Sequence, residues 1–286
     1  MSDYHGYATK SFTTPFFTLE VTTEVGPRFV RLIPAGTTLN LFAELPTFHW
    51  TTEAGDLYPL GGHRLWVSPE RPAITYLPDM KGCKLAEKES GFVLSREDDF
   101  QDTHYSRTIE VTFDAHSPRM TVKHTLLNRA QAPLLAGPWG ITMFRLGSRV
   151  FLPFSDQPAD PFTLLGNRNL ALWPYTRLDD PRLKVTDKGV SIVGLAQQDA
   201  CKVGIYSPLG WAAIEFPEGY TLVKRVAALP AENYPDFNTN WQCYVRDMFI
   251  ELETLGKLGQ VQPGESVSIT EEWELLKGSL QENGLV

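Results

Sequence analysis

The stretch YSRTIEVTF, residues Tyr105 to Phe113, decides the fold class. In an extended strand, successive side chains point to opposite faces. Ile109 and Val111 then share one face with the two terminal aromatic residues, while polar residues occupy the other face. This alternation is typical of a half-buried strand in an antiparallel sheet.

Short runs of β-branched and aromatic residues recur along the rest of the chain. The 22 Gly and 21 Pro separate these runs and leave few stretches long enough for a helix. Residues 41–45 and 180–183 are expected to form no more than single helical turns, the second with Pro181 at its first position. We therefore predict an all-β protein, with strands at Phe16–Thr23, Arg28–Ile33, Gly91–Arg96, Tyr105–Phe113, Arg119–Asn128, Val190–Val193, Lys202–Ser207, Trp211–Phe216, Asp247–Glu253 and Ser266–Glu274.

The bulk composition is that of an ordinary globular protein, with 42% hydrophobic and 21% charged residues. No repeat or low-complexity linker divides the 286 residues, so we predict a single domain over residues 1–286; its densest loop, 154–161, is the place where a seam would fall. The three cysteines have no C-x-x-C spacing and are expected to be buried free thiols.

Charge and hydropathy exclude several classes of partner. The net charge is -8 and no Lys/Arg cluster interrupts the pattern, so nucleic acid is not expected. The amino-terminal residues do not resemble a secretion signal, and no run of about 18 apolar residues suggests a membrane span. We expect a cytoplasmic protein; its sequence carries no indication of an oligomeric state.

The first group of candidate site residues lies in YPLGGHRLWVSPE, residues 58–70. If Leu65 faces the core, Arg64 and Trp66 share the opposite face and offer hydrogen-bond donors and a stacking platform for a sugar ring. His63 then points the other way unless a bulge intervenes. Read in isolation, the same string fits a tight hairpin with a buried Trp and an Arg that holds a carboxylate.

The second group lies in FIELETLG, residues 249–256. Period two places Glu251 and Glu253 on one face, about 7 Å apart. Mutual repulsion in a desolvated site would raise one pKa, which suits acid–base work on sugar hydroxyls. A solvated edge with two ordinary glutamates is an equally good interpretation, and we assign Glu271, Glu272 and Glu274 to such an edge.

A few further residues complete the candidates. Trp139, beside Gly and Pro, is either a stacking platform or core filler, and His49 is a candidate for supporting contacts. Lys224 and Arg225 are either a phosphate site or an exposed basic pair. No histidines have metal-ligand spacing, and no nucleotide or hydrolase motif occurs, so we expect no metal and no cofactor.

The carboxyl-terminal residues resemble a known family. Leu252-Glu253-Thr254, then Pro263-Gly264-Glu265 and the T-x-x-W of residues 270–273, resemble the ending of the aldose 1-epimerases. Together with G-G-H-R-x-W near the start, the string is more similar still to an uncharacterised bacterial family of the same fold. The resemblance spans roughly residues 16 to 276 and implies a galactose-mutarotase-like supersandwich of large antiparallel sheets.

The resemblance implies roles for the candidate residues. Glu253 matches the general base of the epimerases, which remove the anomeric hydroxyl proton while a histidine protonates the ring oxygen. Residues 137–140 read GPWG where that histidine is expected, which leaves His63 as candidate acid and Arg64 as a donor to ring hydroxyls. The concave face would bind a small carbohydrate, with Trp66, Trp139, Glu251 and His49 as its substrate-binding residues.

Three functions remain open from the sequence. The first is interconversion of sugar anomers without a cofactor. The second is a sugar-binding or sensor module that has lost the acid, favoured by the missing histidine. The third is a glycoside hydrolase or polysaccharide lyase that uses Glu251 and Glu253, ranked last because residues on one strand rarely flank a glycosidic bond from both sides.

Overall fold

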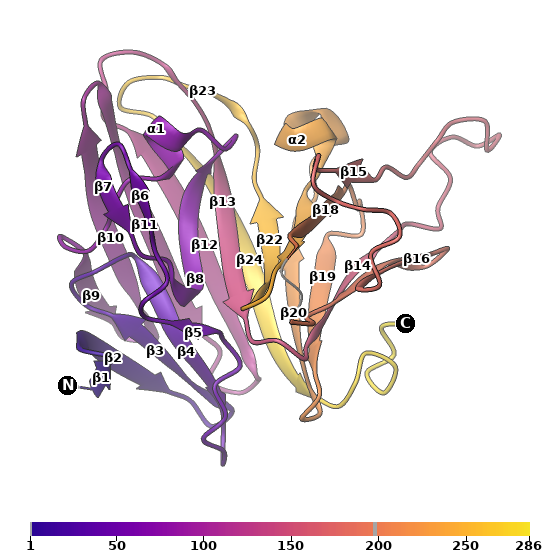
Figure 1. Cartoon of the computed structure of the whole chain (residues 1–286), viewed down its shortest axis with the longest axis horizontal. Coiled ribbons are helices and arrows are strands. Elements are labelled where there is room, and N and C mark those ends of the chain that lie inside the picture. Colours follow the sequence, from indigo (N-terminus) through magenta and orange to yellow (C-terminus); the bar gives the residue numbers. More distant parts are fainter. Residues whose placement is uncertain (1, 197–198) are drawn as a thin grey trace.

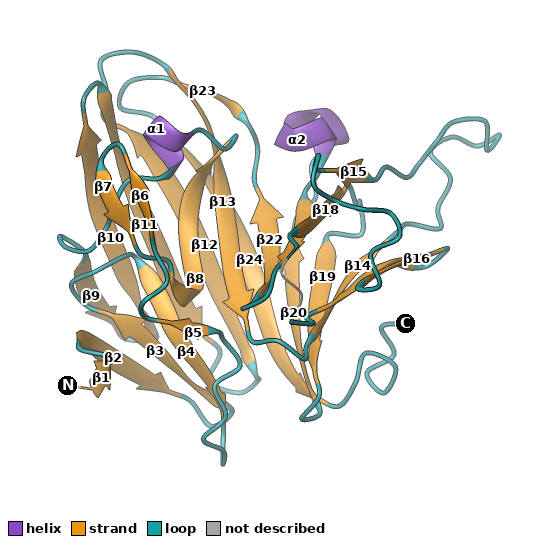
Figure 2. Ribbon diagram, viewed as in Figure 1, coloured by secondary structure: helices purple, strands orange, loops and turns teal. Residues whose placement is uncertain are grey.

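A computed structural model describes residues 2–196 and 199–286. Within these ranges the strands form a 12-stranded sheet, a 10-stranded sheet and a 2-stranded sheet. The two large sheets pack face to face, and short helices lie at one end of them (Figures 1 and 2). The predicted all-β fold of large antiparallel sheets is confirmed.

The 12-stranded sheet carries the site described below. Its central strands are antiparallel to one another and come from distant parts of the sequence. In spatial order the strands are β1 (Ser2–Tyr4), β2 (Tyr7–Thr13), β3 (Phe17–Thr22), β4 (Arg28–Pro34), β8 (Leu60–Ser68), β13 (Leu134–Phe144), β22 (Ile250–Leu255), β21 (Trp241–Val245), β18 (Cys201–Ile205) and β15 (Ala171–Leu172), with β23 (Gly259–Val261) on β13 and β5 (Glu44–Leu45) on β8.

The 10-stranded sheet covers one face of the first. Its strands, in spatial order, are β16 (Leu183–Thr186), β17 (Gly189–Val193), β14 (Arg149–Pro153), β19 (Trp211–Phe216), β20 (Tyr220–Val226), β24 (Ser266–Lys277), β12 (Arg119–Asn128), β11 (Thr103–Phe113), β10 (Gly91–Phe100) and β9 (Lys84–Lys88). The remaining elements are the hairpin β6 (Trp50–Thr52) and β7 (Gly55–Leu57), the helices α1 (Pro72–Thr75) and α2 (Pro235–Asn238), and the 3-10 turn η1 (Ala231–Asn233).

The main core lies between the two large sheets and follows the predicted alternation. In β11, Ile109 and Val111 are buried, and the polar residues between them are partly exposed. Arg107 is also buried on this inner face, where its guanidinium pairs with Asp98 and Asp79. Burying a charge is costly unless it is paired, and these carboxylates provide the pairing. The three cysteines are free and buried, as expected.

The structure corrects several local predictions. Residues 41–45 form no helical turn, because Phe42 bridges to Phe144 and Glu44–Leu45 pair with β8. At 180–183 the Asp180 carboxylate accepts hydrogen bonds from the Arg182 backbone and guanidinium, and the chain then enters β16 instead of a helix. Residues 134–144 form one continuous strand through Pro138 and Trp139.

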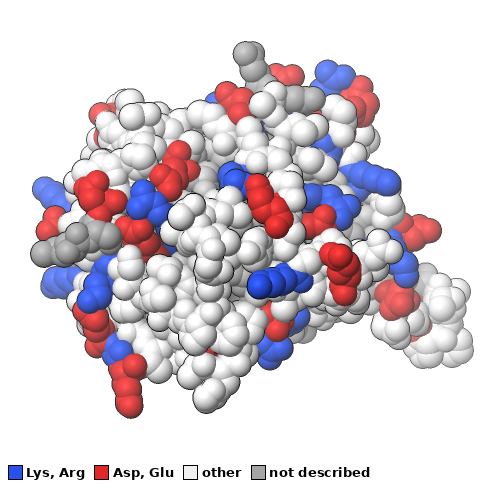
Figure 3. Space-filling model, turned by 90° about the horizontal axis from the view of Figure 1, so that it is seen from below, with Lys and Arg blue, Asp and Glu red and all other residues white. Residues whose placement is uncertain are grey.

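The molecular surface carries charges of both signs (Figure 3). Acidic and basic side chains are interspersed on the face seen from below (Figure 3). Such mixing is typical of a solvated surface. Across residues 2–196 and 199–286, none of the helices has the length and apolar character needed to span a bilayer.

Candidate functional site

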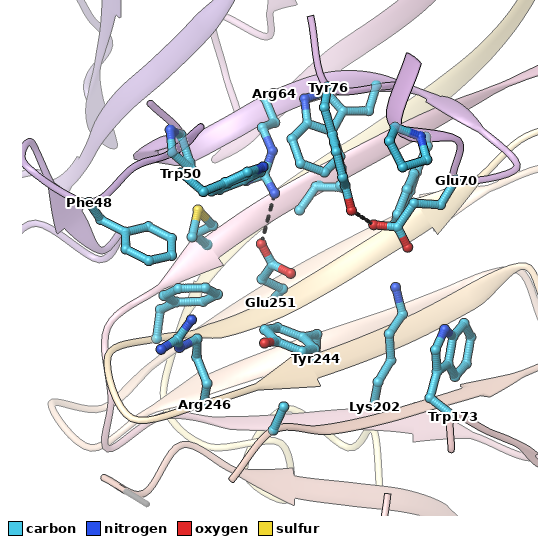
Figure 4. Close-up of a pocket in the computed structure, with 18 of the residues that line it drawn as sticks. Phe48, Trp50, Arg64, Glu70, Tyr76, Trp173, Lys202, Tyr244, Arg246 and Glu251 are labelled. Atoms are coloured by element: carbon cyan, nitrogen blue, oxygen red, sulfur yellow. Dashed lines mark hydrogen bonds and ion pairs between the residues drawn. The ribbon is translucent and has the colours of Figure 1, made fainter. Parts of the chain in front are cut away.

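A cavity of about 700 Å³ opens on the 12-stranded sheet, on the face turned away from the 10-stranded sheet. This volume is within the range of small-molecule sites, about 300–1,000 Å³. Figure 4 shows charged side chains at its centre and aromatic rings around them. The cavity is lined by Phe48, Trp50, Pro59, Arg64, Trp66, Glu70, Pro72, Tyr76, Trp139, Ile141, Met143, Trp173, Tyr175, Ala200, Lys202, Tyr244, Arg246, Phe249 and Glu251.

Strand register explains why these side chains meet. On β13, Ile141 lies opposite Arg64 of β8 on one side and opposite Glu253 of β22 on the other. Side chains directly across from one another point to the same face of a sheet. Tyr244 is similarly opposite Glu251 and opposite Lys202. Five neighbouring strands, β8, β13, β22, β21 and β18, therefore project these side chains towards the same face.

Glu251 and Arg64 form the central ion pair. Arg64 Nη2 donates to Glu251 Oε1 at 3.0 Å, and the guanidinium lies 4.2 Å from the centre of the Trp66 ring. Arg64 Nε and Nη1 are buried without hydrogen-bond partners within the described residues. Arg64 and Trp66 thus share a face, and two nitrogens of the guanidinium make no hydrogen bond within the described residues.

Burial raises the pKa of Glu251 to about 7. This value is the net result of several causes: burial and the charge of Glu253 raise the pKa, and the Arg64 guanidinium lowers it. A carboxyl group that titrates near neutrality is able both to accept and to release a proton under physiological conditions.

Glu253 occupies a different position from the one that the sequence suggested. Its side chain is fully buried and is not among the groups that line the cavity. Its Oε2 accepts hydrogen bonds from Lys202 Nζ at 2.9 Å and Trp139 Nε1 at 2.8 Å. The carboxylate that reaches the cavity is therefore Glu251, and Glu253 lies behind Lys202 and Trp139.

The two histidine candidates lie outside the cavity. His63 points between the two large sheets, where its ring approaches His124 and Trp273 with centroid distances of 4.9 Å. No bulge interrupts β8 at this position, so His63 and Arg64 face opposite sides, as strand alternation requires. His49 stacks on Tyr58 with centroids 4.8 Å apart and does not line the cavity.

Aromatic rings form a continuous wall around the charged groups. Successive centroids along Trp139, Trp66, Tyr76, Trp50 and Phe48 are 5.3 to 5.8 Å apart. Flat, apolar rings beside a few convergent polar groups are suited to the faces and hydroxyls of a sugar.

Several lining residues were missed by sequence reasoning. Lys202 carried a signal, since it is a charged residue near the start of the otherwise apolar strand CKVGI. Trp50, Tyr76 and Trp173 carried none, because they belong to hairpins and loops whose position depends on tertiary packing.

Two expectations about surface charge are wrong. Lys224 is fully buried and pairs with Glu271, and Arg225 pairs with Glu274, so they do not form an exposed basic pair. Glu271 and Glu274 are also buried, and only Glu272 of the three glutamates is half-exposed. Among the described residues, no three His, Cys, Asp or Glu side chains are grouped so as to hold a metal ion.

Comparison with known proteins identifies the fold. No family model and no curated protein matches the sequence. A "putative aldose 1-epimerase" from Klebsiella pneumoniae superimposes with a TM-score of 0.64 at 12% identity, covering 100% of this chain and 84% of the other. One from Escherichia coli gives 0.60 at 14% identity, with 95% and 100% covered. The chain has the galactose mutarotase-like fold.

A galactose mutarotase-like protein from Lactobacillus casei extends the comparison, with a TM-score of 0.54 and 9% identity over 94% of this chain and 100% of the other. At such identities the likeness establishes the mutarotase-like fold, and the chemistry must be argued from the residues of the cavity.

Proposed function

We propose that the protein binds a reducing sugar in the aromatic cavity and interconverts its anomers, with Glu251 as the group that exchanges the anomeric hydroxyl proton. The observation that carries this proposal is the position of Glu251: a buried carboxyl group in the cavity, with its pKa raised to about 7 and paired with Arg64. A base is most effective when its pKa lies near the working pH.

Arg64 and the aromatic wall have binding roles in this proposal. The Arg64 guanidinium, which lines the cavity, donates to sugar hydroxyls, and Trp66 and Trp139 contact the apolar faces of the ring. The reaction needs proton transfer alone, so no cofactor is required. Mutarotase-like proteins at 9 to 14% identity support a sugar as the ligand class.

The alternative is a sugar-binding module without catalysis. It is favoured by one observation, that none of the described residues lining the cavity is a histidine. The hydrolase or lyase interpretation loses its basis, because Glu253, the second carboxylate of the pair, does not line the cavity.

Exchange NMR distinguishes these functions. Glucose, galactose, mannose, xylose and arabinose are each mixed with the wild type and with Glu251→Gln, and α/β exchange is read at the anomeric carbon. We expect accelerated exchange with at least one sugar and a loss of about 10²–10⁴-fold in Glu251→Gln. The matched control is Glu272→Gln, which alters a half-exposed glutamate outside the cavity and should leave exchange unchanged.

Each other outcome has a definite meaning. Binding without accelerated exchange would establish the binding module, and absence of binding across the panel would overturn the sugar site. Exchange that persists in Glu251→Gln would remove Glu251 from the mechanism.

A further inference from the structure

Lys202 is a nearly buried cation for which the proposed binding roles do not account. It lies near the start of β18, its residue is 5% exposed, and its ammonium reaches the cavity. Lysine is almost never buried to this degree unless it is paired. The pairing comes from Glu253 Oε2, 2.9 Å from Nζ.

The Lys202 ammonium is surrounded by two aromatic rings and one carboxylate. The ammonium lies 4.6 Å from the centre of the Trp139 ring and 4.8 Å from that of Trp173. An ammonium has three N–H groups, and Glu253 accepts from one. Within the described residues no other side chain accepts a hydrogen bond from Nζ, so the other two are free for a ligand in the cavity (Figure 4).

Few other groups in the cavity are able to release a proton. Arginine does not deprotonate in proteins, which excludes Arg64 and Arg246. Burial raises the pKa of Tyr244 to about 12, and burial also raises the pKa of Tyr76 and Tyr175. No histidine is present among the described lining residues.

We propose that Lys202 is the proton donor to the ring oxygen, acting together with Glu251. This inference rests on the proposed function. Tyr244 lies directly between Lys202 and Glu251 in the strand register, so the two groups flank the ring of one bound sugar. The ammonium thereby takes the role that a histidine has in the epimerases.

The proton balance closes without any other reactant. Glu251 takes the proton of the anomeric hydroxyl while the bond between C1 and the ring oxygen breaks. The electron pair of that bond goes to the ring oxygen, which takes a proton from Lys202, and C1 becomes an aldehyde. After rotation about the C1–C2 bond, the reverse steps return one proton to Lys202 and place the proton of Glu251 on the new anomeric oxygen.

Glu253 is a positioning residue in this scheme. Its carboxylate is fixed by Trp139 Nε1 at 2.8 Å and holds Lys202 against the two indoles. The glutamate that matches the epimerase base in sequence therefore acts through Lys202.

The test compares Lys202→Met, Lys202→Arg and Lys202→Ala with the wild type, for a sugar that the wild type interconverts. We expect the rate of anomer exchange to fall by about 10²–10⁴-fold in Lys202→Met and in Lys202→Arg. The arginine keeps the positive charge but has no proton to transfer. Methylammonium should restore exchange in Lys202→Ala, at rates that follow the acidity of the amine supplied. Lys188→Met, at an exposed lysine, is the matched control.

Specific results would overturn the inference. Near wild-type exchange in Lys202→Met or Lys202→Arg would show that no proton from this residue is needed. A covalent adduct on Lys202 after borohydride treatment would show that the amine attacks the aldehyde. If the wild type itself does not accelerate exchange, the proposed function fails first, which separates the two failures. If circular dichroism shows that Lys202→Met or Lys202→Ala does not fold, Lys202→Arg is the deciding variant.

Discussion

Two polar clusters lie on opposite sides of the 12-stranded sheet and have opposite relations to water. The cavity cluster consists of Arg64, Lys202, Glu251 and Glu253. The inter-sheet cluster lies on the other face, between the two large sheets, and consists of His63, His124, Thr142, Lys224 and Glu271. Residues 63 and 64 are neighbours in sequence and yet belong to different clusters.

The members of the inter-sheet cluster are joined by a chain of hydrogen bonds. Lys224 Nζ is 2.7 Å from Thr142 Oγ1 and 3.2 Å from Glu271 Oε2, and His63 bridges Thr142 at 2.8 Å to His124 at 2.7 Å. Burial lowers the pKa of both histidines, that of His124 to about 4, so both rings are neutral near pH 7. Lys224 then donates to Thr142, Thr142 to His63 Nδ1, and His63 Nε2 to His124.

The cavity cluster, in contrast, has several N–H donors that make no hydrogen bond within the described residues. Two nitrogens of Arg64 lack partners within the described residues, and Lys202 has N–H groups to spare. In the inter-sheet cluster the atoms without hydrogen bonds, His124 Nδ1 and Glu271 Oε1, face each other at 3.7 Å. Charged side chains between the two sheets therefore contribute to the packing of the sheets, whereas those that face the cavity are available for chemistry.

The largest expected effect is on the inter-sheet cluster. Glu271→Gln leaves Lys224 as a buried charge without its counter-ion, and breaking a buried pair in this way costs about 3–5 kcal/mol of unfolding free energy. Urea denaturation measures the loss, with Glu272→Gln, at the half-exposed neighbouring glutamate, as control. A change below about 1 kcal/mol would show that the cluster does not stabilise the sheets.

A glycine behind the cavity should have the next largest effect. A Cβ on Gly140 would lie 2.6 Å from Oε1 of Glu271, a carboxylate whose other oxygen is held by Lys224 and Trp273. We expect Gly140→Ala to cost about 1–3 kcal/mol by overpacking. Gly259→Ala is the matched control, since a Cβ there meets nothing within 4 Å. Equal stability of the two variants would contradict this geometry.

The fold, and the pairs of side chains that share the cavity face of their strands, could be predicted from the sequence. Alternation placed Arg64 with Trp66 and Glu251 with Glu253, because strand periodicity is a local property. It could not reveal which glutamate reaches the cavity, since that depends on Lys202, 51 residues away from Glu253. Nor could it reveal that Glu271 is buried, because polar alternation in β24 resembles that of a solvated edge until the facing strands supply partners.

A smaller effect should appear in the pH dependence of stability. The pKa of Glu251 is raised from 4.5 to about 7 by folding, so its favourable contribution is complete below pH 4.5 and is lost as pH rises through 7. Glu251→Gln removes this titration. Relative to the wild type, the variant should gain about 2–3 kcal/mol between pH 5 and 8, at about 1.4 kcal/mol per pKa unit. Parallel stability curves from denaturation at each pH would show that Glu251 does not titrate there.

The smallest expected effect is on the pH midpoint of the exchange rate, which should respond to the cavity cluster and not to the inter-sheet cluster. If Glu251 accepts the anomeric proton, the rate of exchange should rise with pH through about 7, because the carboxylate is the active form. Arg64 lowers this pKa, so Arg64→Gln should move the midpoint upward by about one pH unit, beyond any loss of sugar affinity. Thr142→Val, which alters the inter-sheet cluster at 2.8 Å from His63, should leave the midpoint in place. A midpoint that follows Thr142 instead of Arg64 would mean that the two faces of the sheet are coupled, and that the inward cluster takes part in the chemistry after all.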